Sequence, residues 1–66
     1  MILVEFSFII PTERVKQSDS HLCLNGFDAK NLGKKLIYAL DLKQVEISWE
    51  TSTTKENIII NKPKQL

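Results

Sequence analysis

The chain has 66 residues, with nine basic and eight acidic side chains and a formal net charge of +1. This near-neutral balance gives no electrostatic reason to expect a nucleic-acid or acidic-lipid partner, and Cys23, the only cysteine, excludes a disulfide within the chain. A chain this short buries only about 60% of the surface of its unfolded form. We therefore expect a single domain, residues 1–66, whose thin core would gain from a homodimer.

The first ten residues, MILVEFSFII, predict a β-strand over 2–10. Apolar residues at every even position alternate with a mixed set at the odd positions, which is the period of a strand. The segment lacks a basic start, carries Glu5 and is too short to cross a bilayer, so we do not interpret it as a signal peptide or membrane span. The expected absence of a signal peptide, together with the lone thiol, favours a cytoplasmic location.

The next segment, PTERVKQSDS at 11–20, is polar and starts with Pro11, so we interpret it as a loop with room for one helical turn around 12–16. The sequence leaves open whether HLCL, at 21–24, forms a short strand of the sheet. If it does, Leu22 and Leu24 would face the core, and His21 and Cys23 would face the other way. Asn25-Gly26 then predicts a turn.

A helix is expected from Ala29 to Leu40 or Leu42, with Asp28 as its N-cap. Its apolar residues fall at helical spacing and form one stripe. The stripe consists of Ala29, Leu32, Leu36, Ile37 and Leu40. Phe27 and Leu32 have the spacing of a hydrophobic staple, and Gly33 would allow the helix to approach the sheet closely.

Two further strands are expected at 45–50 and 57–61, joined by a polar turn into a hairpin. A polar C-terminal tail, 62–66, follows, and Pro63 ends the ladder.

This order, β-(β)-α-β-β, predicts an α+β two-layer sandwich. One helix lies on one face of a mainly antiparallel sheet of three or four strands. Its expected core is Val4, Phe6, Phe8, Leu22, Leu24, Leu32, Leu36, Leu40, Val45, Ile47, Trp49, Ile58 and Ile60. The uncovered sheet face would carry the other half of each strand, namely Leu3, Glu5, Ser7, Ile9, His21, Cys23, Glu46, Ser48, Glu50 and Ile59.

No catalytic, cofactor-binding or metal-binding residue is assigned. His21-x-Cys23 supplies two potential ligands where zinc needs three or four, and nothing positions a third group for a thiolate nucleophile. Glu5, Glu46 and Glu50 could form a general acid/base group, but alternating glutamates are also typical of a solvated strand face. A sheet this small leaves little room for a concave pocket of several hundred Å³.

The leading hypothesis is a non-enzymatic protein-interaction module that presents a sheet face or edge, such as an accessory protein, inhibitor or immunity-like protein of a bacterium or phage. The expected interaction residues are Glu5, Ser7, Glu46, Ser48 and Glu50, with Tyr38 at the helix edge. The alternative is a nucleic-acid accessory protein acting through Lys30, Lys34, Lys35, Lys62 and Lys64. A third hypothesis is a minimal enzyme that works only as an oligomer, with Glu5, His21 and Glu46 lining a cleft between chains.

Overall fold

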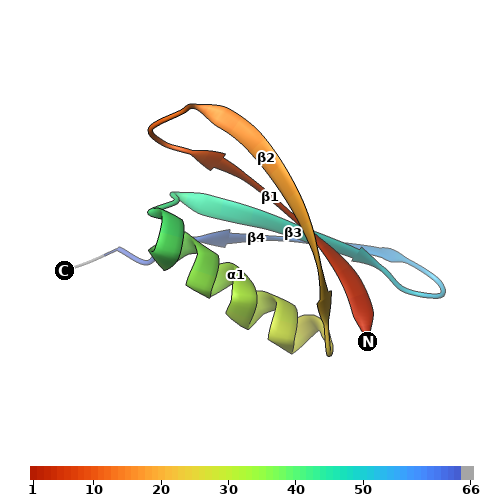
Figure 1. Ribbon diagram of the computed structural model, residues 1–66. Helices are drawn as coiled ribbons and strands as arrows, with labels where there is room; N and C mark the ends of the chain where they lie inside the picture. Colours follow the sequence, from red (N-terminus) through yellow and green to blue (C-terminus); the bar gives the residue numbers. More distant parts are fainter. Residues whose placement is uncertain (65–66) are drawn as a thin grey trace.

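The computed structural model describes residues 1–64 and consists of one helix packed on one four-stranded antiparallel sheet (Figure 1). In chain order its elements are β1 (Ile2–Ile10), β2 (Val15–Cys23), α1 (Gly26–Leu40), β3 (Gln44–Glu50) and β4 (Lys55–Asn61). The strand order across the sheet is β2-β1-β3-β4. The α+β two-layer architecture predicted from the sequence is confirmed.

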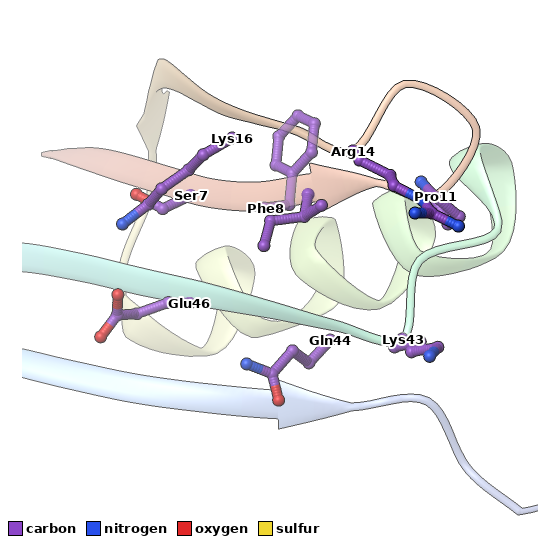
Figure 2. A pocket seen from close by; sticks show the side chains of 9 residues that line it. Ser7, Phe8, Pro11, Arg14, Lys16, Lys43, Gln44 and Glu46 are labelled. Atoms are coloured by element: carbon purple, nitrogen blue, oxygen red, sulfur yellow. The ribbon is translucent and has the colours of Figure 1, made fainter.

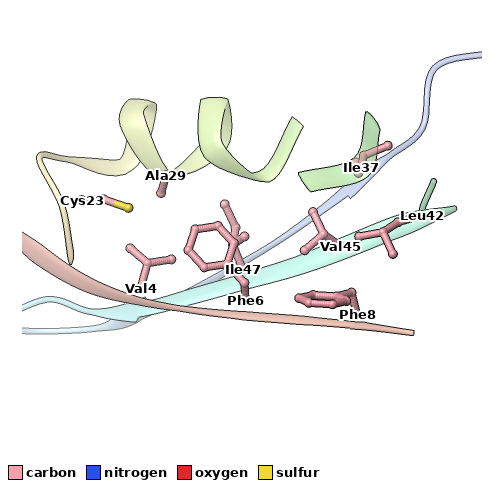
Figure 3. Packing of buried hydrophobic residues seen from close by; sticks show 9 residues of the cluster. All are labelled: Val4, Phe6, Phe8, Cys23, Ala29, Ile37, Leu42, Val45 and Ile47. Carbon is pink, nitrogen blue, oxygen red and sulfur yellow. The ribbon is translucent and has the colours of Figure 1, made fainter. Parts of the chain in front are cut away.

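β1 lies inside the sheet because its even-numbered residues supply the centre of the core. Val4, Phe6 and Phe8 are buried, and Phe6 lies opposite Ile47 of β3 in the strand register. Figure 3 shows the nine buried side chains gathered between sheet and helix. They are Val4, Phe6, Phe8, Cys23, Ala29, Ile37, Leu42, Val45 and Ile47.

The polar segment before the helix is a full strand, which corrects the expected loop at 11–20. β2 pairs with β1 along its whole length, from Ile10 opposite Val15 to Ile2 opposite Cys23. The connection Pro11–Arg14 is a tight turn in which Arg14 has a φ of 56° and its N–H donates to the Ile10 carbonyl at 2.8 Å. Backbone pairing with β1 thus outweighs the weak strand preference of Ser, Asp and Lys, which suit an exposed edge strand.

The prediction of which side chains of residues 21–24 face the core is also wrong. Cys23 lies opposite the half-buried Ile2 and is buried on the helix side, whereas Leu22 is 69% exposed and Leu24 is exposed as well. His21 is on the helix side too, and its ring meets the Phe6 ring edge-on at 5.5 Å. The cause is the register, since a residue paired with β1 must share the face of its partner.

The helix starts at Gly26, three residues before the expected position, and Asn25 rather than Asp28 is its N-cap. The Asn25 side chain accepts a hydrogen bond from the Asp28 N–H at 2.9 Å, and the Asp28 carboxylate in turn accepts from the Leu24 N–H at 2.9 Å. This reciprocal arrangement resembles a capping box. At the other end, Asp41 adopts a left-handed conformation and donates its N–H to the Ile37 carbonyl.

The helix buries a narrower stripe than expected. Ala29, Gly33 and Ile37 are buried, Leu32 and Leu36 are half-buried, and Leu40 is mostly outside the core. A Cβ added to Gly33 would lie 3.1 Å from Ile60 and 3.3 Å from Val45, so the predicted close approach at this glycine is confirmed.

Phe27 is 74% exposed, so the expected staple with Leu32 does not form. Once Asn25 is the cap, Phe27 lies in the first helical turn rather than before it, where it would have to lie to form a staple.

The predicted hairpin is present as β3 and β4, which pair from Gln44 opposite Asn61 to Glu50 opposite Lys55. Of the other residues expected in the core, Trp49, Ile58 and Ile60 are half-buried. In the expected tail, Lys62 is tied back by its N–H to the Lys43 carbonyl and by its ammonium to Asp41, each contact being short. Gln65 and Leu66 lie outside the described residues.

Candidate interaction surface

One face of the sheet is covered by α1, and the opposite face, which we call the open face, carries no second layer in the part of the chain described (Figure 1). Because side chains alternate along each strand, the open face takes every second residue of all four strands. These residues are Lys16, Ser18, Ser20 and Leu22 of β2; Leu3, Glu5, Ser7 and Ile9 of β1; Gln44, Glu46, Ser48 and Glu50 of β3; and Lys55, Asn57, Ile59 and Asn61 of β4.

The five strand residues expected to mediate interaction lie together on the open face. Ser7 is opposite Glu46, and Glu5 is opposite Ser48, so each of these two glutamates has a serine as its cross-strand neighbour in the middle of the face. Ser7 also shares a hydrogen bond of 3.1 Å with Ser18 of β2. Tyr38 lies elsewhere, on the exposed side of α1.

His21 and Cys23 belong to the helix side and not to the open face, contrary to expectation. The proposed oligomeric active site is affected directly, because Glu5 and Glu46 lie on one side of the sheet and His21 on the other. A single copy therefore does not bring these three side chains together. Within residues 1–64, no group of three or more His, Cys, Asp or Glu side chains is placed to hold a metal ion.

The open face is hollowed near the β1–β2 turn, where an open depression of about 600 Å³ lies beside the strands (Figure 2). Its rim carries Arg14, Lys16 and Lys43, and Glu46 is the acidic member of its lining. This hollow is larger than expected from the sequence, which left little room for a concave pocket on so small a sheet.

Sequence reasoning missed the basic rim because it placed Arg14 and Lys16 in a loop of unknown position. The one available signal was that Arg14 is the only arginine of the chain. Lys43 joins it only because β3 starts beside the end of β1.

The solvent side of α1 combines lysines with exposed aromatics. Lys30, Lys34 and Lys35 are exposed, as are Phe27 and Tyr38, the latter at 60%. Positions 27, 34 and 38 fall on one flank at helical spacing. Lys62, in contrast, is half-buried, and its ammonium lies 2.6 Å from the Asp41 carboxylate, while Lys64 is exposed.

Two groups have displaced pKa values. Burial raises the pKa of the Cys23 thiol, and the charge of Asp28 raises it further. The hydrogen bond and charge of Lys62 lower the pKa of Asp41. A buried thiol held in its protonated form is a poor nucleophile, so Cys23 acts here as a small core residue.

No protein-family model, curated protein or solved structure matches this chain. In residues 1–64, α1 is too short and too polar to cross a membrane.

Proposed function

We propose that the protein is a small, non-enzymatic interaction module that binds another protein through its open face. The observation that carries the proposal is a whole sheet face left without a second layer. Among its polar residues this face exposes four large apolar side chains, namely Leu3, Ile9, Leu22 and Ile59. Exposed apolar side chains set among polar ones are typical of protein interfaces.

The charges of the open face give the proposed interface an orientation. Arg14, Lys16 and Lys43 surround the hollow at one end. Glu5 and Glu50 lie at the other end, around a smaller depression that Lys55 also lines. A partner with acidic groups facing the hollow and basic groups facing the glutamates would be favoured in one orientation, since charge complementarity fixes register more than it adds affinity.

An accessory, inhibitor or immunity-like protein of a bacterium or phage, acting in the cytoplasm, fits this proposal. Such a protein needs a rigid surface and no reactive groups. The analogy rests on size and surface character alone.

The proposal is tested by blocking the centre of the open face. Ser7→Arg combined with Ser48→Arg places two bulky charges there without touching the core, and Asn31→Arg on the exposed side of α1 is the matched control. The tagged protein is recovered from its host after chemical crosslinking, and co-recovered proteins are quantified by mass spectrometry. Circular dichroism checks the fold of each variant.

We expect one protein to be recovered in near-equal amount with the wild type and with Asn31→Arg, and at least about tenfold less with the double variant. Equal recovery with the double variant would exclude the open face as the binding surface. Recovery of the bait alone would argue against an interaction module.

A second candidate, a nucleic-acid accessory protein, is favoured by the exposed side of α1. Its lysines are accompanied by Phe27 and Tyr38, which are exposed and could stack on bases of a single strand. The set is smaller than the sequence suggested, because Lys62 already pairs with Asp41.

Charge reversal tests this second candidate. Lys34→Glu with Lys35→Glu should abolish any binding to single-stranded DNA or RNA at moderate salt, because phosphate contacts dominate such affinity. If affinity is unchanged by the double reversal, the helix does not bind nucleic acid.

A further inference from the structure

We infer that the chain binds a second copy of itself through the free edge of β4, so that two sheets join into one continuous antiparallel sheet. This goes beyond the proposed function, because it names a second copy of the chain as a partner and uses the edge of the sheet rather than the open face. Its test uses the purified protein alone, so its failure is distinguishable from loss of a different protein partner.

The backbone of β4 directs N–H and C=O groups to the edge of the sheet, where they can pair with another strand. The Lys62 N–H donates to the Lys43 carbonyl and the Thr51 N–H to the Thr54 carbonyl, both across the β3–β4 ladder. In an antiparallel ladder the backbone groups of successive residues point to alternate sides. The N–H and C=O groups of even-numbered residues of β4 therefore point to β3. Those of Asn57, Ile59 and Asn61 point to the free edge of the sheet.

The sequence of this edge is self-complementary. It reads Glu-Asn-Ile-Ile-Ile-Asn-Lys from Glu56 to Lys62, which is symmetric about Ile59 except that its ends carry opposite charges. In a two-fold antiparallel pair centred on Ile59, each Glu56 lies opposite Lys62 of the second copy. Asn57 then meets Asn61, Ile58 meets Ile60, and Ile59 meets Ile59.

A two-fold interface requires this kind of match, since the same patch must serve both sides. The pairing would form backbone hydrogen bonds at all three edge-facing residues of each copy. It would also cover isoleucines that a single copy leaves half-buried or, at Ile59, 55% exposed. The Lys62 ammonium, with three donor hydrogens, can keep its bond to Asp41 while it faces Glu56 of the second copy.

The other edge of the sheet does not offer the same match. β2 carries Lys16 and Asp19 within its strand, and its central residue is Asp19. A symmetric pair about that centre would place two carboxylates opposite each other, which is unfavourable. Charged residues of this kind are how edge strands avoid pairing, and β4 has none from Asn57 to Asn61.

The test compares two single-charge variants by sedimentation and light scattering over a wide concentration range. Ile59→Lys places like charges at the centre of the pair, and within one copy the new lysine lies beside Glu46. The control, Ile9→Glu, changes an equally exposed isoleucine of the open face on an inner strand, where the new glutamate lies beside Lys16.

We expect the wild type and Ile9→Glu to reach twice the 7.6 kDa mass of one chain. Ile59→Lys should raise the dissociation constant at least about tenfold. Hydrogen exchange of the unaltered protein provides a second readout, in which the N–H groups of Asn57, Ile59 and Asn61 become protected as concentration rises.

Three results would overturn the inference. The first is the mass of one chain at every concentration, and the second is a dimer that survives Ile59→Lys with these three N–H groups still exchanging freely. The third is a dimer weakened equally by both variants, which would place the interface on the open face instead.

Discussion

At the scale of single residues, Phe6 and Phe27 show how the position of a side chain decides its contribution to the stability of the fold. Phe6 is fully buried opposite Ile47, whereas Phe27 is exposed in the first turn of α1. Phe6→Ala should lower the free energy of unfolding by about 3–5 kcal/mol, enough to unfold a domain this small. Phe27→Ala, the matched control, should change it by less than about 0.5 kcal/mol. Urea unfolding followed by circular dichroism measures both, and a cooperatively folded Phe6→Ala protein would contradict the assigned register of β1.

Cys23 allows a second test at this scale, because its thiol is buried and its pKa is raised. Near neutral pH the thiol should react with a water-soluble disulfide reagent at least about a hundredfold more slowly in the native protein than in urea. Rapid labelling of the native protein would mean that Cys23 faces solvent, as the sequence alone suggested.

At the scale of elements, the start of α1 depends on which of two good capping residues is used. Asn25→Ala removes the side-chain acceptor of the Asp28 N–H and should destabilise the protein by about 1 kcal/mol. Asn31→Ala, at an exposed position inside the helix, should be neutral or slightly stabilising because alanine has the higher helix propensity. Thermal unfolding compares the two variants, and an unaffected Asn25→Ala protein would mean that Asn25 is not the working cap.

At the scale of the whole molecule, Asp41 and Lys62 connect the end of the helix to the end of β4. The pKa of Asp41 is lowered in the folded chain, so the ion pair stabilises the fold above the unfolded pKa of about 4. That contribution is lost as pH falls through the lower, folded value. Asn is a suitable replacement for Asp41, because it also adopts the left-handed backbone conformation found at this position. The Asp41→Asn protein should melt at a lower temperature than the wild type at pH 7, and this difference should shrink as pH falls below about 4. A difference in melting temperature that does not change with pH would show that the charge of Asp41 is not responsible.

Much of the fold could be predicted because β1, β3 and the helix each carry a clear hydrophobic period, and because β4 is a short run of isoleucines between polar residues. The alternation in β1 and β3 also assigned the odd residues of β1 and the serine and glutamates of β3 to one face. The open face was therefore partly predictable. The hollow was not, because Arg14, Lys16 and Lys43 come together only through the turn after β1 and the start of β3.

The sequence by itself determined the two-layer class, the core of β1 and β3 and the approximate position of the helix, because each depends on local periodicity. Only the tertiary structure decided that residues 15–23 form a strand, that Cys23 is buried while Leu22 is exposed, and that the helix begins at Gly26 with Asn25 as its N-cap. The reason in each case is a non-local contact. β2 exists through its hydrogen bonds to β1, its phase is fixed by register against β1, and the start of α1 packs on Trp49, whose ring would lie 3.0 Å from a Cβ at Gly26.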